Sequence, residues 1–487
     1  MTPAKQNKQI KVLPKSPTGI PGMDEITGGG LPKGRPTLVA GAAGCGKTLF
    51  AMEVLVNGAT QFDEPGVFVA FEENAEELTQ NVASLGFDLR KLSRQKKLIV
   101  DHIRVERSEI EETGDYDLEG LFIRLGYAID SIGAKRVVLD TIEVLFSSFS
   151  NQGILRAELQ RLFRWLKDKG VTAVITAERG EGTMTRFGLE EYVADCVILL
   201  DHRVTDQIST RRLRIVKYRG TLHGTNEYPF LIGKHGISVL PITSLTLDHR
   251  VSTERVSTGI QELDDMLDGK GFYRGSSILL SGTAGTGKTS MAAAFVDAAC
   301  QRGERCIYFA FEESADQIIR DMRSIGIDLK PHVKKGLLRI HVARPSQYGL
   351  EMHLVSIYDM IQEYKPHIVV LDPITDFTTV GSEFEIKSAV TRILDFLKVN
   401  AVTALFISVT SENKSVDQSV VGISSLIDAW INLRNIENNG ERQRGLFILK
   451  SRGMAHSHQI RSFELTDDGI KIGQVNIAGP REESSKV

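Results

Sequence analysis

The sequence predicts an α/β protein of two tandem domains, each a mostly parallel β-sheet flanked by helices. Four short motifs occur twice in the same order, about 230 to 240 positions apart, as in a duplicated domain. Within each copy, short β-branched runs alternate with helical periods, which is the pattern of βα units. The chain has 487 residues, 41% of them hydrophobic, so each copy can bury its own core.

The motif order divides the chain into five segments. We expect a flexible N-terminal segment at 1–15, a first domain at 16–243, a Thr/Ser-rich linker at 244–256, a second domain at 257–473 and a short polar tail at 474–487.

The composition excludes several classes of protein. Lys plus Arg total 59 against 62 for Asp plus Glu, so no excess of positive charge favours a coat of nucleic acid. The N-terminus lacks the apolar core of a signal peptide, and no run approaches the roughly 20 apolar residues of a membrane span. We therefore expect a cytosolic protein. Its four cysteines form no C-x-x-C pair, and we interpret them as ordinary thiols.

Each domain opens with a phosphate-binding motif between a predicted strand and a predicted helix. The first copy spans 41–48 and the second spans 282–289. Glycines let the backbone N–H groups wrap a phosphate at a helix N-terminus, the lysine neutralises its charge, and the final hydroxyl can bind Mg²⁺. A chance Gly-rich turn is the alternative, and two matched copies argue against it. The predicted ATP-binding residues of these loops are Gly41, Gly44, Gly46, Lys47, Thr48, Gly282, Gly285, Gly287, Lys288 and Thr289.

An aspartate ends the Val-Val-Leu-Asp strand of each copy, at Asp140 and at Asp372. The carboxyl edge of a parallel sheet is where ligand-binding residues gather. We predict that these carboxylates hold Mg²⁺, together with the hydroxyls of Thr48 and Thr289. A helix N-cap is the alternative role for an aspartate at a strand end.

A pair of glutamates follows the strand predicted at 66–70, and a second pair follows the strand at 306–310. Because successive strand residues face opposite ways, one carboxylate of each pair can face the γ-phosphate. It could then orient an attacking water or hydroxyl and accept its proton. A solvated loop pair is the alternative. The predicted catalytic residues are Glu72, Glu73, Glu312 and Glu313.

The fourth motif, Lys-x-Arg-Gly-x-x-His, supplies Lys217, Arg219 and His223 in the first copy and Lys450 and Arg452 in the second. Lys-x-Arg puts two cations on one face of a strand, and such cations stabilise a transferring phosphoryl group. We predict that they bind ATP at a neighbouring subunit's site, in a ring whose active sites are completed in trans. Surface salt bridging is the alternative.

Together the repeated motifs resemble the KaiC family of circadian clock proteins, within the RecA-like ATPase superfamily, over roughly 16–472. Residues 186–195 also resemble the first-domain signature of that family. The resemblance implies two RecA-like domains in a two-tiered homohexamer that uses ATP and Mg²⁺. It further implies a slow ATPase in the first domain, an autokinase and phosphatase in the second, and a timing or stress-response role. In the family the first Glu of each pair is catalytic, which corresponds to Glu72 and Glu312.

The two copies differ where an ATPase and a kinase should differ. Aligning Asp195 with Asp428 sets Ser424 and Ser425 opposite Glu191-Tyr192, so only the second copy has aliphatic hydroxyls there.

The resemblance implies that Ser424 and Ser425 accept phosphate and that Ser419 can hold it transiently. At two of these positions, Ser425 and Ser419, the family has threonine, and the serine keeps the hydroxyl. The alternative is that 422–426 only starts a helix with serine caps.

The resemblance also bears on partners and on competing functions. It implies a KaiB-like partner on the first-domain ring, whereas the short tail argues against a KaiA-like activator. A recombination or DNA-repair ATPase would need basic, Gly-rich DNA loops, and none is visible in the sequence. A nucleotide-gated hexameric scaffold without phosphotransfer remains the other alternative. We expect no nucleic-acid or membrane partner.

Overall fold

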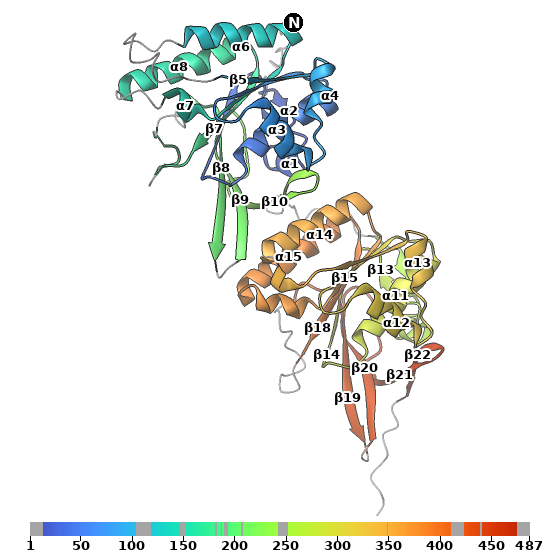
Figure 1. The fold of residues 1–487 in the computed structure, drawn as a ribbon. Coiled ribbons are helices and arrows are strands. Elements are labelled where there is room, and N and C mark those ends of the chain that lie inside the picture. The colour runs from blue at the N-terminus through green and yellow to red at the C-terminus, as the bar shows by residue number, and fades with distance from the viewer. Residues whose placement is uncertain are drawn as a thin grey trace, which may run out of the picture. The chain divides into compact units, whose positions relative to one another are not determined.

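The computed structural model describes residues 13–103, 118–146, 152–180, 183–186, 188, 193–205, 208–241, 252–347, 349–410, 423–438 and 441–474. The chain divides into two compact units, Met1–Ser244 and Leu245–Val487. In each unit a large, mostly parallel sheet carries helices on both faces (Figure 1), so the fold class predicted from the sequence is confirmed. Most of the predicted N-terminal segment, linker and tail lies outside the described residues.

The described strands of the first unit are β1 (Lys15–Ser16), β2 (Leu31–Pro32), β3 (Pro36–Gly41), β4 (Gly66–Ala70), β5 (Leu98–His102), β6 (Arg136–Asp140), β7 (Thr172–Glu178), β8 (Cys196–Thr205), β9 (Ile208–Tyr218), β10 (Glu227–Gly233) and β11 (Gly236–Val239). Nine of these described strands form one sheet in the order β11-β10-β9-β8-β3-β7-β6-β4-β5. The six strands from β8 to β5 run parallel, and β9, β10 and β11 extend the sheet antiparallel. β1 and β2 pair separately.

The described helices of the first unit are α1 (Met23–Ile26), α2 (Lys47–Gln61), α3 (Ala75–Ala83), α4 (Leu89–Arg94), α6 (Glu119–Ile132), α7 (Ile142–Phe146) and α8 (Gln152–Asp168). They cover the two faces of the sheet in two groups. Helices α1 to α4 contribute to one buried apolar cluster, and α6, α7 and α8 contribute to another. Figure 1 shows α6 and α8 side by side on the face opposite α2.

The second unit repeats this plan with the strands β12 (Arg255–Val256), β13 (Phe272–Tyr273), β14 (Ser277–Gly282), β15 (Cys306–Ala310), β16 (Leu338–Val342), β17 (Ile368–Asp372), β18 (Thr403–Val409), β19 (Ala429–Asn438), β20 (Glu441–Ser451), β21 (Arg461–Thr466) and β22 (Gly469–Gln474). Its nine-stranded sheet, as described, has the order β16-β15-β17-β18-β14-β19-β20-β21-β22. The order and the strand directions therefore match those of the first unit, as expected for a duplication.

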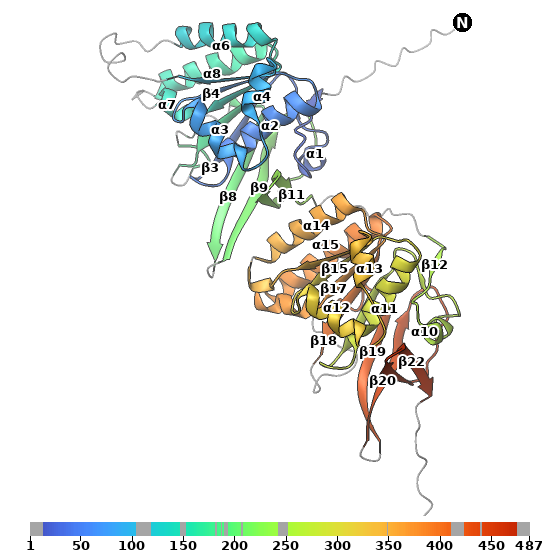
Figure 2. The same ribbon diagram turned by 45° about the vertical axis from the view of Figure 1, so that its right-hand side comes forward.

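The described helices of the second unit are α10 (Gln261–Met266), α11 (Lys288–Gln301), α12 (Ala315–Arg323), α13 (Lys330–Lys334), η1 (Pro345–Gln347), α14 (Leu350–Tyr364), η2 (Ile374–Thr379) and α15 (Glu383–Val399). Helices α10, α11 and α12 share one buried cluster with the sheet. The turned view in Figure 2 shows α14 and α15 together on the other face.

Burial on both faces explains why the parallel strands read as continuous apolar runs. In β3, Leu38 packs into the cluster of α6 and α8, whereas its neighbour Val39 packs into the cluster of α2. This two-sided packing brings the carboxyl ends of β3, β7, β6 and β4 to one edge of the sheet, where the polar residues of the site follow. Among the described helices, none combines the length and the apolar character that a bilayer span requires.

Candidate active sites

The two phosphate-binding loops join β3 to α2 and β14 to α11. Four of their glycines adopt left-handed φ values between 71° and 104°, a region that favours glycine: Gly44, Gly46, Gly285 and Gly287. The first glycine of each loop lies against the neighbouring strand. An added Cβ would approach a carbonyl oxygen to 2.5 Å at Gly41 and to 2.2 Å at Gly282. The loop shape therefore requires glycine at these positions.

The loop lysines are buried at the start of their helices, with 8% of Lys47 and 6% of Lys288 exposed. Lys47 Nζ donates to the carbonyl oxygens of residues 41 and 42 at 2.9 and 3.0 Å. Lys288 Nζ donates to those of residues 282 and 283 at 2.9 and 2.7 Å. Burial lowers the pKa of Lys288, while the carboxylates of Asp372 and Glu312 raise it. Each ammonium group is thus held inside its loop.

The predicted Mg²⁺ ligands of the second unit lie together. Thr289 Oγ1 donates to Asp372 Oδ2 at 2.9 Å, and the buried Tyr308 hydroxyl donates to the same oxygen. Burial raises the pKa of Asp372. This hydroxyl and carboxylate set fits Mg²⁺, which takes one or two protein oxygens and completes its shell with phosphate and water.

The first unit has the same arrangement around Asp140, with a different supporting residue. The hydroxyls of Thr48 and Thr176 both hydrogen-bond its carboxylate, and burial raises its pKa. The described residues contain no cluster of three or more His, Cys, Asp or Glu that could hold a metal ion. A P-loop site needs no such cluster, because the substrate phosphates supply ligands.

The predicted catalytic glutamates lie beside the predicted Mg²⁺-binding aspartates, because the backbone hydrogen bonding between the parallel strands continues past each strand end. The N–H of Phe71 donates to the carbonyl of Asp140 at 2.9 Å, and the N–H of Phe311 donates to that of Asp372 at 2.8 Å. Glu72 and Glu312 follow these two phenylalanines directly.

The first glutamate of each pair interacts with the phosphate-binding lysine. Burial, followed by Glu178 and Asp140, raises the pKa of Glu72, whereas Lys47 lowers it. Glu312 likewise acts on the pKa of Lys288. The second glutamates differ, because Glu73 Oε2 accepts from Asn81 Nδ2 on α3 at 3.3 Å.

Burial, followed by the charge of Asp372, raises the pKa of Glu313. In the first unit these contacts favour Glu72 over Glu73 as the group that faces the nucleotide. In the second unit both Glu312 and Glu313 interact with Asp372, so the contacts do not separate them.

Two carboxylates of the first unit escaped the sequence reasoning. Glu178 ends β7, beside Gly41 in the sheet, and its N–H donates to Glu143 Oε1 at 2.5 Å. In the second unit Val409 ends β18, and its N–H donates to Thr375 Oγ1 at 3.3 Å. The rule that found the two aspartates also applies to Glu178, whereas Glu143 needed the structure.

Asp195 and Asp428, which the sequence alignment pairs, make equivalent backbone contacts. Their N–H groups donate to the carbonyls of Pro36 at 3.2 Å and Ser277 at 2.9 Å. Their own carbonyls accept from the N–H groups of the two motif arginines at 2.9 and 2.8 Å. Both aspartates therefore lie at the amino-terminal edge of the sheet, opposite the P-loop edge.

The second-unit cations contact the serine segment that they were not predicted to bind. Lys450 Nζ donates to the carbonyl of Ser424 at 2.9 Å, and Arg452 Nη2 donates to that of Ser425 at 2.6 Å. Residues 424–426 form a turn and not the start of a helix, and Ser425 is exposed. Ser419 and the Glu191-Tyr192 pair lie outside the described residues.

In the first unit the motif arginine lies near the aspartate instead. Arg219 Nη1 lies 3.7 Å from Asp195 Oδ1, and Lys217 pairs with Val197 across the strands. The His223 ring lies 6.1 Å from that of Tyr218. In both units the lysine is in the strand, but the arginine follows its end, because the next residue is a glycine with positive φ.

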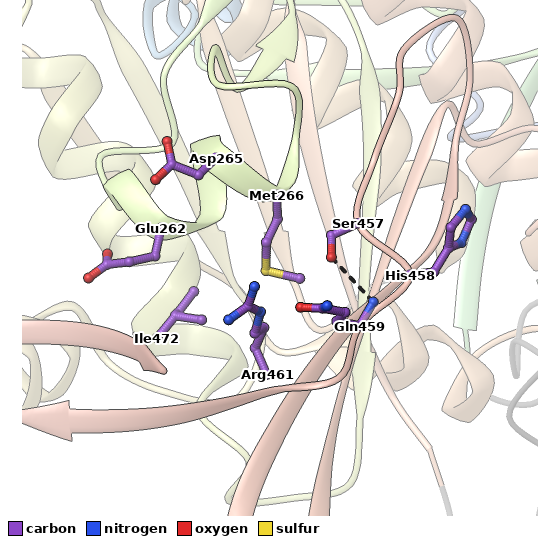
Figure 3. A pocket seen from close by; sticks show the side chains of 8 residues that line it. All are labelled: Glu262, Asp265, Met266, Ser457, His458, Gln459, Arg461 and Ile472. Atoms are coloured by element: carbon purple, nitrogen blue, oxygen red, sulfur yellow. Dashed lines mark hydrogen bonds between the residues drawn. The ribbon is translucent and has the colours of Figure 1, made fainter. Parts of the chain in front are cut away.

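Two hollows lie in the described part of the second unit, one beside the P-loop and one away from it. One of about 440 Å³ opens beside Gly285 of the P-loop, with Arg442 and Arg444 of β20 in its wall. The other, about 510 Å³, lies between α10 and the β20–β21 connection, where Met266 and Arg461 point toward one another (Figure 3). None of the residues that line the second hollow is a predicted site residue.

Comparisons with known proteins agree with this geometry. A family model described as "ATPase: KaiC" matches residues 16–244 and again 256–476. "Circadian clock protein KaiC2" of Synechocystis sp. is 57% identical over 468 residues, which cover 96% of this chain and 82% of that protein. "Circadian clock oscillator protein KaiC" of Synechococcus elongatus is 39% identical over 476 residues, which cover 97% and 91%.

Proposed function

The chain belongs to the KaiC family of ATPases, and on this premise we propose that its second domain phosphorylates Ser424 or Ser425 of a neighbouring subunit, whereas its first domain hydrolyses ATP. In this proposal the chain forms a homohexamer, and its phosphorylation state regulates a timing or stress response. The names of its relatives support the timing role.

The observation that carries this proposal is the position of the serine turn. Asp428, three residues after Ser425, binds Ser277 at the start of β14, while the P-loop follows Gly282 at the end of that strand. The five steps between the six residues of β14, at about 3.3 Å each, separate the two edges by roughly 17 Å. Phosphoryl transfer needs reacting atoms about 3 to 3.5 Å apart. A subunit's own P-loop therefore lies too far from its own serines, and transfer takes place between subunits.

The transfer step uses residues from two subunits. The serine oxygen attacks the γ-phosphorus of ATP, the bond to the β-phosphate oxygen breaks, and ADP leaves with that electron pair. The serine proton passes to the Glu312 carboxylate, while Lys288 neutralises charge on the phosphates. Mg²⁺, held by Thr289 and Asp372, supplies further positive charge at the β- and γ-phosphates when bound.

In the first domain the same arrangement acts on a water molecule, which takes the place of the serine hydroxyl as the attacking group. Glu72 orients the water and accepts its proton, with Glu143 and Glu178 as further carboxylates at that edge. Lys217 and Arg219 approach the phosphates of a neighbouring subunit, as Lys450 and Arg452 do in the second domain. The extra carboxylates of the first domain and the serines of the second support this division of labour.

A mixed-ring experiment tests transfer between subunits. One variant, Lys288→Ala, keeps the serines but loses ATP binding in the second domain, and the other, S424A/S425A, keeps the P-loop but loses the acceptors. After co-assembly with Mg-ATP, mass spectrometry should find phosphate on the Lys288→Ala chains, because their neighbours can phosphorylate them. Rings of either variant alone should stay unmodified. If the parent is phosphorylated but the mixed rings are not, transfer takes place within one chain. If the parent itself stays unmodified while it releases ADP, the protein is an ATPase scaffold without phosphotransfer.

A further inference from the structure

The turn that follows β17 brings another carboxyl group to Glu312. Residues Ile374–Thr379 form the short 3₁₀ helix η2, and the half-buried Asp376 lies in it. The carboxyl groups of Asp376 and Glu312 share a hydrogen bond. Two carboxyl groups can do this only when one of them carries a proton.

Aromatic packing fixes the two segments against one another. Phe311 precedes Glu312 and Phe377 follows Asp376, and their ring centroids are 4.8 Å apart. Both rings are buried, and His353 of α14 packs against both, with centroids 6.5 and 5.6 Å away. The packing of these buried rings therefore holds the segments that carry the two carboxyl groups close together.

The first domain has no carboxyl group at the position equivalent to Asp376, and its further carboxylates, Glu143 and Glu178, come from other positions. Counting from the magnesium aspartate, Asp376 stands four residues after Asp372, and Val144 stands four residues after Asp140. The pair is thus confined to the domain in which we propose phosphoryl transfer to serine.

The charges around Asp376 favour a shared proton. Burial comes first, then Glu312 from the end of β15 and Asp372 from β17, and together they raise the pKa of Asp376 to about 6; Arg344, beyond β16, acts in the opposite direction.

We propose that Asp376 is a positioning residue of the autokinase: its carboxyl group donates a hydrogen bond to Glu312 and aims the free carboxylate oxygen at the acceptor serine. The inference rests on the proposed role of Glu312. During transfer the serine proton goes to Glu312, and Asp376 keeps its own proton, so no other reactant is needed.

Two variants of Asp376 in the full chain test this role through the rate of serine phosphorylation between about pH 5 and about pH 8. Asp376→Ala should lower the rate about 10- to 100-fold at unchanged KM for ATP, because Glu312 loses its orientation. Asp376→Asn keeps a donor that does not titrate, so it should retain most of the rate. The parent should lose rate as pH rises through the pKa of Asp376, about 6, and the Asn variant should not.

The controls separate this inference from the proposed function. Thr378→Ala removes a hydroxyl that only bonds the carbonyl of Thr375 in the same turn, and it should leave the rate unchanged. ADP release by the first domain should persist in every variant and reports intact folding. A parental rate in Asp376→Ala, with Glu312→Gln inactive, overturns the inference alone. An active Glu312→Gln overturns the proposed base itself.

Discussion

Lys450 Nζ lies 2.9 Å from the carbonyl oxygen of Ser424, so a cation predicted to bind phosphate also holds the backbone of the predicted acceptor. Removing a charged hydrogen bond of this kind costs about 1.5 to 3 kcal/mol. We expect Lys450→Met to slow serine phosphorylation by about tenfold or more, because the turn loses its position. Quantitative phosphopeptide mapping over a time course measures this. Lys217→Met is the matched control, since it alters the first domain only; an equal loss in both variants would contradict a local role at the serine turn.

Glu53 makes the stability of the first unit depend on pH. Its side chain is buried in α2, accepts from the N–H of Ile237 at 2.7 Å, and has a pKa that burial raises to about 8. The folded unit therefore keeps a proton that the unfolded chain releases above about pH 4.5. Stability is fully present below that pH and falls as pH rises toward about 8, by at most about 1.4 kcal/mol per pH unit.

Glu53→Gln should abolish this slope, because the amide oxygen still accepts from Ile237 and does not titrate. Denaturant unfolding of the first unit at a series of pH values gives the comparison. In the second unit the same helix position, six residues after the P-loop lysine, is Ala294. Unfolding of the second unit should therefore lack this slope in both the parent and the Glu53→Gln variant. Parallel pH profiles for the parent and the variant would show that Glu53 is ionised in the fold.

The parts of the site that follow strand ends were predictable from the sequence, and the parts that depend on tertiary contacts were not. The strands expected at 66–70 and 306–310 have those bounds in the structure, because an apolar run between turn residues defines a buried parallel strand. Tyr308 lies inside such a run, and nothing in its position indicates that its hydroxyl reaches Asp372. The approach of Asp376 to Glu312 depends on the path of η2, which local patterns do not encode.

Arg136 should stabilise the first unit far more than an ordinary surface cation. It is 1% exposed, its Nη2 lies 2.7 Å from Glu64 Oε2, and it also donates to the carbonyls of Val54 and Pro17 at 2.8 Å. Breaking one partner of a buried ion pair costs about 3 to 5 kcal/mol. We expect Arg136→Met to lower the unfolding free energy of the first unit by that order, measured by denaturant titration or by exchange of the α2 amides.

Arg124 supplies the control for Arg136. It pairs with Asp101 at 2.6 Å, but its side chain is 53% exposed. Arg124→Met should therefore cost less than about 1 kcal/mol. Equal losses for the two variants would mean that the Arg136 contacts add nothing beyond a surface pair.

The two P-loop lysines offer the sharpest test of a division between the domains, because they make the same contacts in their loops. Lys47→Ala should impair ring assembly and ATP hydrolysis, whereas Lys288→Ala should leave the ring intact and mainly abolish serine phosphorylation. Both variants lose one cation held by two backbone carbonyls, so the substitution is chemically matched. Light scattering reports assembly, ADP release reports hydrolysis, and phosphopeptide mapping reports transfer. If both variants abolish phosphorylation while the ring stays whole, the domains do not divide the work, and nucleotide in the first domain must also be needed for transfer in the second.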